Sequence, residues 1–143
     1  MLQVKIAETA EDKEIAFSIR KKVFVEEQGI PLHLEIDEHD HSATHFIIFE
    51  NNEPIAAARL RLTDVATGKV ERVCVLPEHR GKHFGVFVME AIEEHAKTLH
   101  VEKLKLNAQT YAIPFYEKLQ FEIISPEFTD SGIPHRAMEK ELD

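Results

Sequence analysis

The segment at residues 70–96 constrains the fold more than any other part of the chain. An apolar, β-branched run typical of a buried strand stops at Pro77, and an amphipathic helix begins a few residues later. Between them lies a basic turn that contains Gly81 and Gly85. A helix start offers free backbone N–H groups, so cations and glycines at this point favour an anion site. The segment therefore predicts a strand, an anion-binding loop and a helix.

The flanking segments indicate how this strand pairs. The helix at residues 81–99 is followed by a strand in which Leu104 and Leu106 alternate with polar residues. A strand, a long helix and a second strand form a crossover, so these two strands should run parallel. On the other side, strands at residues 43–50 and 55–62 come before the segment with short turns, which predicts an antiparallel meander.

The remaining segments complete a mixed α/β pattern. A half-buried strand opens the chain, a helix follows it to about Phe24, and a polar loop covers residues 33–42. A short helix over residues 111–119 precedes a strand at 121–124 and an edge strand at 134–140. An exposed edge of this kind can pair with a second copy, which leaves a homodimer open.

Composition narrows the function classes. A chain of 143 residues with 43% apolar and 30% charged residues is typical of one globular domain, expected here over residues 1–143. The net charge of −9 argues against a nucleic-acid binder, which would need a basic face. No apolar run reaches the roughly 20 residues of a membrane helix, and the N-terminus does not read as a signal peptide. We therefore expect a cytoplasmic protein without a membrane partner.

The histidines do not predict a metal site. His39, His41 and His45 lie close together, but their spacing fits no strong zinc template and no cysteine is nearby. We expect solvated loop residues and no bound metal. The one cysteine, Cys74, excludes an intrachain disulfide and is expected to be a small buried side chain.

The basic turn resembles the signature of a known family. Its sequence, Arg80-Gly81-Lys82-His83-Phe84-Gly85, is similar to the Arg/Gln-x-x-Gly-x-Gly/Ala acyl-CoA signature of the GNAT N-acetyltransferases. Residues 115–121 resemble the family's Phe-Tyr-x-x-x-Gly-Phe segment, and Asn107 lies at the end of the preceding strand. Segments at 23–31, 58–61, 71–73 and 132–135 look like the ElaA-type branch. The sequence departs from the pattern at His83 and Gln120, which stand in place of glycine.

The resemblance implies a fold, a cosubstrate and a reaction. The fold would be a GNAT-like three-layer α/β arrangement, in which helices flank a mixed, mostly antiparallel sheet of about seven strands in the order β-α-(α)-β-β-β-α-β-α-β-β. The reaction would be N-acetylation by acetyl-CoA, with direct transfer to a small-molecule or peptide amine in a ternary complex. A non-catalytic acyl-CoA-binding sensor or interaction module would use the same loop and stays open as an alternative.

The same resemblance implies cofactor contacts. The pyrophosphate would lie on the backbone N–H groups of the basic turn, and the pantetheine arm would pair with the strand before it. The residues expected to contact acetyl-CoA are Val73, Cys74, Val75, Arg80, Gly81, Lys82, His83, Phe84, Gly85, Asn107 and Tyr116.

Two residues are expected to take part in proton transfer. Tyr116 would protonate or hydrogen-bond the CoA thiolate as it leaves. Glu71 would take a proton from the amine, directly or through water, or would instead be an ion-pair partner of a nearby arginine. The residues expected on the acceptor side are Glu26, Glu27, Arg59, Arg61 and His135.

Overall fold

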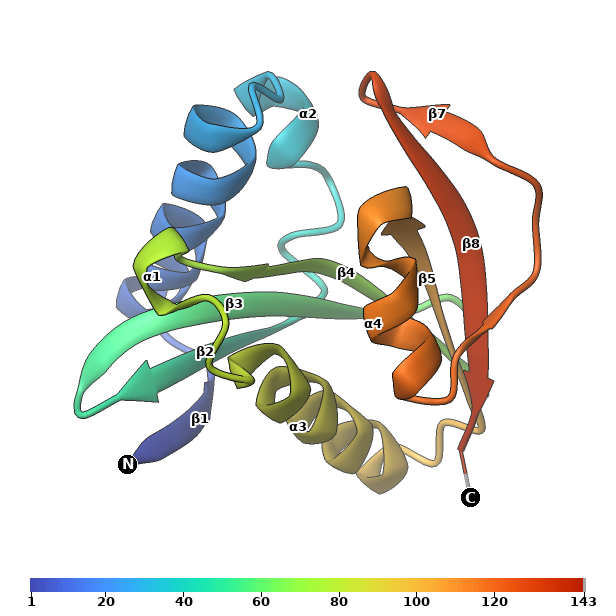
Figure 1. The fold of residues 1–143 in the computed structure, drawn as a ribbon. Helices are drawn as coiled ribbons and strands as arrows, with labels where there is room; N and C mark the ends of the chain where they lie inside the picture. The colour runs from blue at the N-terminus through green and yellow to red at the C-terminus, as the bar shows by residue number, and fades with distance from the viewer. Residues whose placement is uncertain (143) are drawn as a thin grey trace.

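The computed structural model describes residues 1–142, which form a large sheet with helices on both faces (Figure 1). The strands are β1 (Leu2–Ile6), β2 (Thr44–Glu50), β3 (Glu53–Leu62), β4 (Thr67–Val75), β5 (Lys103–Gln109), β6 (Glu122–Ile123), β7 (Phe128–Asp130) and β8 (Ile133–Glu141). The helices are α1 (Ala10–Arg20), α2 (Leu32–Glu35), α3 (Phe84–Thr98) and α4 (Ile113–Lys118). A π-helical segment (Lys21–Glu27) continues α1, and 3-10 turns cover Pro77–His79 and Thr110–Ala112.

The described residues form eight strands, in the order β1-β2-β3-β4-β5-β8-β6, and β7 also pairs with β8. Neighbouring strands are antiparallel except β4 and β5, which run parallel on either side of the α3 crossover. The predicted meander and crossover are therefore confirmed, with eight strands rather than about seven. The sequence places β8 at an edge, and this prediction is wrong, because β8 pairs with β5 on one side and with β6 and β7 on the other. The possible homodimer stays a prediction, although β8 itself is not the free edge.

Alternation along the strands divides the core into two layers, because successive side chains point to opposite faces. Phe46 and Ile48 of β2 pack in the layer that contains Val88 and Ile92 of α3. Ile47, between them, packs in the layer formed with α1. The sheet thus lies between α3 with α4 and α1 with the π-helical segment, as the three predicted layers require (Figure 1).

The helix that follows β1 changes pitch where the sequence predicts a uniform helix. Thr9 caps its start, because Oγ1 accepts a hydrogen bond from the Asp12 N–H at 3.1 Å. The α-helix ends at Arg20, and the π-helical segment continues to Glu27. Wider π-helical turns are rare and often occur at functional sites. The short helix α2 then occupies the start of the region expected to be a loop.

The strands β4 and β5 pair over only part of their length. The parallel register joins residues 67–70 of β4 to residues 103–106 of β5. Just beyond, Arg72 has a φ of 59° and the register of β4 against β3 shifts, which marks a β-bulge. From this point β4 leaves β5 while its pairing with β3 continues to Val75. The carboxyl ends of two adjacent parallel strands are therefore separated.

Candidate active site

A cavity of about 630 Å³ lies where β4 and β5 separate. Residues 69–75 of β4 and 106–109 of β5 line its base. Phe24, Ile30 and Leu34, from the π-helical segment to α2, form an apolar wall, and residues of α4, β7 and β8 line the other side. Segments that are far apart in the sequence thus meet around one space.

The loop before α3 presents free donors at one end of this cavity, where Arg80 and Gly85 line it. Among the described residues, the N–H groups of Gly81, Lys82 and His83 make no backbone hydrogen bond. The first N–H groups of α3 are also free, because no helical carbonyl group lies one turn before them to accept their hydrogen bonds. Gly81 has a φ of 80°, which glycine adopts without a steric penalty. These donors lie at the positive end of the α3 dipole and can bind a phosphate-like anion.

The side chains at positions 83–85 of the loop, as distinct from the backbone, play different parts. His83 has a φ of 65°, which is the left-handed conformation. For a residue with a side chain, this conformation lowers the stability of the fold by roughly 1–2 kcal/mol. Phe84 is buried in the core, which leaves only its backbone to face an anion. A Cβ at Gly85 would lie 3.1 Å from Cζ of Phe115, so glycine here allows α3 to lie close to α4.

Arg80 and Glu27 form a bidentate ion pair at the same end of the cavity. Nη1 and Nη2 each donate to the Glu27 carboxylate at 2.6 Å, and Nε donates to the Val75 carbonyl oxygen at 2.9 Å. The hydrogen bond from Arg80 lowers the pKa of the Glu27 carboxyl below its ordinary value. Glu27 therefore lies beside the anion site rather than at the expected acceptor side, and its neighbour Glu26 is exposed.

The open part of β4 offers backbone groups rather than a nucleophile. Val73, Cys74 and Val75 line the cavity beyond the last residue that pairs with β5. The Cys74 side chain packs in the α1 layer, with Sγ 3.8 Å from the carbonyl oxygen of Ala57. Burial raises the pKa of the Cys74 thiol to about 12, so the thiol stays protonated.

Tyr116 lies in α4, on the side of the cavity away from the π-helical segment. Its ring packs against Phe115 and Phe121, with ring centres 5.0 and 5.8 Å away. Tyr116 lines the cavity, and its hydroxyl is not one of the fully buried, unpaired side-chain atoms of residues 1–142. Burial raises the pKa of the phenol above its ordinary value, so the group keeps its proton at neutral pH. Asn107 of β5 also lines the cavity.

Glu71 is held by two arginines. Arg59 Nη2 donates to Oε1 at 2.7 Å, and Arg61 Nε donates to the same oxygen at 3.0 Å. Burial raises the pKa of the Glu71 carboxyl, but the hydrogen bonds from Arg61 and Arg59 outweigh burial and leave the pKa below its ordinary value. A carboxylate in this setting is a weak base, so the geometry favours the ion-pair alternative for Glu71.

Next to Glu71 lies a buried ion-pair network. The fully buried guanidinium of Arg20 donates to Glu35 at 2.8 Å and to Asp40 at 2.6 Å. Arg59, also fully buried, donates to Asp37 at 2.7 Å and to Asp40 at 2.9 Å. The network joins α1, α2 and the following loop to the sheet beside the cavity.

This network corrects one sequence prediction and was itself not predicted. Arg59 was expected to bind the acceptor, and this is wrong, because its guanidinium is fully buried against carboxylates. Arg61 is partly exposed and is bonded to Glu71. A sequence signal for Arg20 does exist: it falls one turn after Ala16 on the buried face of α1, where a charge requires partners.

His135 of β8 lines the cavity together with Asp130 and Ser131 from the β7–β8 hairpin. The residue is 8% exposed, and its ring stacks on Phe128 with 6.0 Å between ring centres. Nδ1 lies 2.7 Å from the carbonyl oxygen of Ile133. His135 therefore lines the cavity, and its assignment to the acceptor side stays a prediction; Asp130 was not singled out from the sequence.

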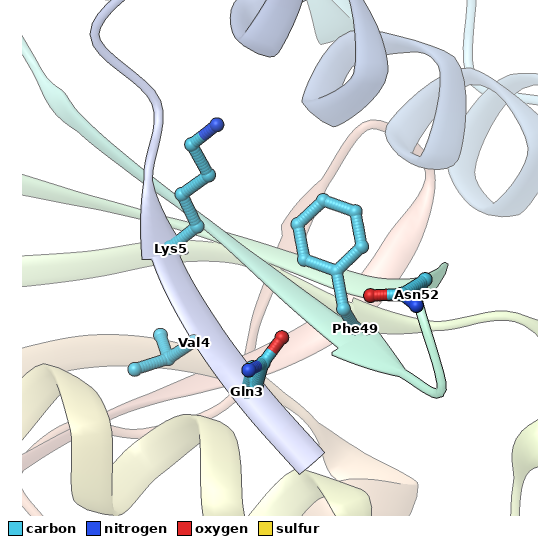
Figure 2. Close-up of a pocket in the computed structure, with 5 residues that line it drawn as sticks. All are labelled: Gln3, Val4, Lys5, Phe49 and Asn52. Carbon is cyan, nitrogen blue, oxygen red and sulfur yellow. The ribbon is translucent and has the colours of Figure 1, made fainter. Parts of the chain in front are cut away.

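A second hollow lies on the edge strand β1, and Figure 2 shows the residues that line it. They are Gln3, Val4, Lys5, Phe49 and Asn52. Lys5 donates to the Asp12 carboxylate at 3.1 Å. Within residues 1–142, none of the sequence-predicted site residues lines this hollow, so it is not the candidate active site.

The described residues contain neither a metal-binding cluster nor a membrane-spanning helix. Over residues 1–142 there is no group of three or more His, Cys, Asp or Glu side chains arranged to hold a metal ion. In the same part of the chain, the helices are too short or too polar to cross a membrane.

Known proteins resemble this chain over nearly its full length. The family model described as an acetyltransferase (GNAT) domain matches residues 6–142. The uncharacterised N-acetyltransferase YjcF of Bacillus subtilis is 40% identical over 141 residues, which is 98% of this chain and 100% of the relative.

Solved structures share the fold. Escherichia coli ElaA is 24% identical with a TM-score of 0.86, over 99% of this chain and 100% of that one. A GNAT family acetyltransferase of Elizabethkingia anophelis with acetyl-CoA bound is 16% identical with a TM-score of 0.78, over 99% of this chain and 98% of that one. At these identities the two structures support the fold alone. The family match over residues 6–142 and the 40% identical relative carry the assignment further, and the chain belongs to the GNAT family of acetyltransferases.

Proposed function

We propose that this protein transfers the acetyl group of acetyl-CoA directly to an amine within a ternary complex. The observation that carries the proposal is the separation of β4 from β5 beyond residues 70 and 106, which opens the cavity beside the free N–H groups before α3. A cavity with two ends lets a thioester and an amine meet without a covalent enzyme intermediate. The acceptor would be a small-molecule or peptide amine, and the reaction would take place in the cytoplasm.

The residues around the cavity fit acetyl-CoA. The N–H groups of Gly81, Lys82 and His83 would bind the pyrophosphate, and the cations of Arg80 and Lys82 would add charge. The pantetheine amides would pair with the backbone of residues 73–75. Backbone groups that leave water need hydrogen-bond partners, and an extended amide chain supplies them along an open strand edge. Asn107 would hold the same arm from β5.

In the transfer step, the lone pair of the neutral amine attacks the thioester carbonyl carbon and the C–S bond breaks. The sulfur leaves as a thiolate and takes the proton of the Tyr116 hydroxyl, which recovers a proton from the new amide nitrogen. Burial raises the pKa of the phenol, so Tyr116 begins the step protonated and would pass its proton to the sulfur as it receives one from the nitrogen. Tyr116 is therefore proposed as the general acid.

Thermal-shift and thiol-release assays test this function. Acetyl-CoA at 100 times its Kd should stabilise the protein by about 2.7 kcal/mol, and CoA thiol should be released with at least one member of a panel of polyamines, amino sugars and lysine peptides. Tyr116→Phe should lower kcat by about 100-fold or more and leave acetyl-CoA affinity nearly unchanged. Wild-type turnover in this variant would exclude Tyr116 as the acid, and binding without thiol release would support the sensor alternative.

A further inference from the structure

The transfer reaction needs a base that the β4 side of the cavity does not supply. An alkylamine is mostly protonated at neutral pH and must lose a proton before it attacks. Glu71 accepts hydrogen bonds from Arg59 and Arg61. Carboxylates that neutralise guanidinium groups hold a proton poorly. A base on another part of the cavity lining would meet this need.

The ring of His135 is held in one tautomer. The carbonyl oxygen of Ile133 can only accept a hydrogen bond, so Nδ1, 2.7 Å away, carries the hydrogen and donates it. In the neutral ring the lone pair then belongs to Nε2. Phe128 stacks on the ring with 18° between the planes, which restricts its rotation.

Nε2 of His135 makes no hydrogen bond to the described residues, and His135 lines the cavity. The fully buried side-chain atoms that lack a partner in residues 1–142 are Nδ1 of His45 and Nδ1 of His79, so Nε2 of His135 is not enclosed. Because His135 lines the cavity, an Nε2 that is not fully buried is available for the role proposed below. Asp130 also lines the cavity and has no ion-pair partner among the described residues. Its carboxylate favours a cationic amine beside the ring.

We propose that Nε2 of His135 is the general base that takes a proton from the acceptor ammonium, an assignment that rests on the proposed transfer function. The overall reaction converts R–NH₃⁺ and acetyl-CoA into the acetamide, CoA thiol and one proton. Nε2 accepts that proton before the attack, and the imidazolium returns it to solvent. The second N–H proton leaves the nitrogen after C–S cleavage and reaches the sulfur by way of Tyr116. His135 would therefore deprotonate the nucleophile, and Tyr116 would protonate the leaving group.

The elements packed against β8 present few charges to His135. Gln109 of β5 lies opposite it in the register, and Phe128 of β7 lies on the other side. The ionisable groups nearest this end of β8 on adjoining elements are Asp130 of β7 and Tyr111 of the 3-10 turn. The lysines of β5 and the glutamate of β6 pair with the far end of β8.

The variant His135→Asn removes the proposed base but keeps the hydrogen bond by which the ring is held. Asn keeps an N–H donor near the position of Nδ1 and has no counterpart of Nε2. We expect kcat to fall by about 100-fold to 10,000-fold, with acetyl-CoA affinity nearly unchanged. The acidic limb of the pH–rate profile should disappear, because that limb reports protonation of the base. The control is His100→Asn, an exposed residue at the end of α3 whose φ of 62° Asn tolerates, and it should keep both the rate and the limb.

Nitrogen NMR of labelled protein gives a readout that needs no identified acceptor. The His135 signals, recognised by their absence in His135→Asn, should show the Nδ1–H tautomer. An Nε2–H tautomer, or an intact acidic limb in His135→Asn, overturns the base assignment and leaves the transferase function standing. Failure of the wild-type protein to bind acetyl-CoA and to release thiol would instead overturn the proposed function.

Discussion

Replacement of Glu27 by Gln should tighten the binding of acetyl-CoA. Both Nη atoms of Arg80 donate to the Glu27 carboxylate at 2.6 Å, and the same donors would face the pyrophosphate in the proposed complex. Two anions then compete for one guanidinium, so the ion pair must break before Arg80 can serve the cosubstrate. The hydrogen bond from Nε to the Val75 carbonyl oxygen keeps Arg80 in place when the carboxylate is removed.

The exposure of the pair sets the size of the effect. The side chains of Arg80 and Glu27 are 41% and 38% exposed, so solvent screens their attraction. Pairs of this kind contribute about 0.2–1 kcal/mol. Since a tenfold change in Kd corresponds to about 1.4 kcal/mol, the variant should bind roughly 1.4-fold to 5-fold more tightly. The gain should shrink at high salt, where both interactions are screened.

Isothermal titration calorimetry with acetyl-CoA measures this difference, and Glu26→Gln is the matched control. Glu26 is the exposed neighbour of Glu27, and its replacement removes the same charge without touching the pair. If Glu27→Gln binds no more tightly than Glu26→Gln at low salt, the two anions do not compete for Arg80. That result would refute the reasoning even if both variants differ from the wild-type protein.

Two other predictions concern stability. His83→Gly should raise the free energy of unfolding, measured by urea denaturation, by about 1 kcal/mol. The substitution relieves the steric strain of a side chain at a φ of 65°, and this gain exceeds the entropy that glycine adds to the unfolded chain. A loss of stability would contradict this. Burial opposes ionisation of Asp40 and Glu71, but arginine hydrogen bonds hold both pKa values below the ordinary range. Their stabilisation is therefore complete above about pH 5, clear of the unfolded-state pKa values, and is lost as the pH falls from there towards the folded-state pKa values. The melting temperature should drop below about pH 5, and a flat profile between pH 5 and 2 would contradict this.

The order of elements was predictable because it depends on local patterns, whereas the place of β8 was not. The partners at its two edges are β5, β6 and β7, which no local pattern specifies. The separation of β4 from β5 is a similar case. It depends on a bulge at Arg72, a residue whose positive φ cannot be read from its type.

The two departures from the family pattern have a common explanation. His83 and Gln120 stand where the pattern has glycine, and their φ values are 65° and 77°. The backbone conformation that glycine would adopt is thus kept at both positions, at the cost of some strain. Sequence reasoning found the positions, but only the backbone angles show that the loop geometry survives the change.

The buried charges determine where a base can be found. Arg72, the bulge residue, donates to the Glu35 carboxylate at 3.2 Å and to Asp37 at 3.1 Å, which ties the bulge to the α2 region. The same network supplies the guanidinium group of Arg59 that lowers the pKa of Glu71. A strand that is held open by charged residues therefore cannot also carry a strong carboxylate base. The proposed mechanism is consistent with this: β4 would provide backbone for the thioester arm, and proton transfer would fall to Tyr116 of α4 and to His135 of β8.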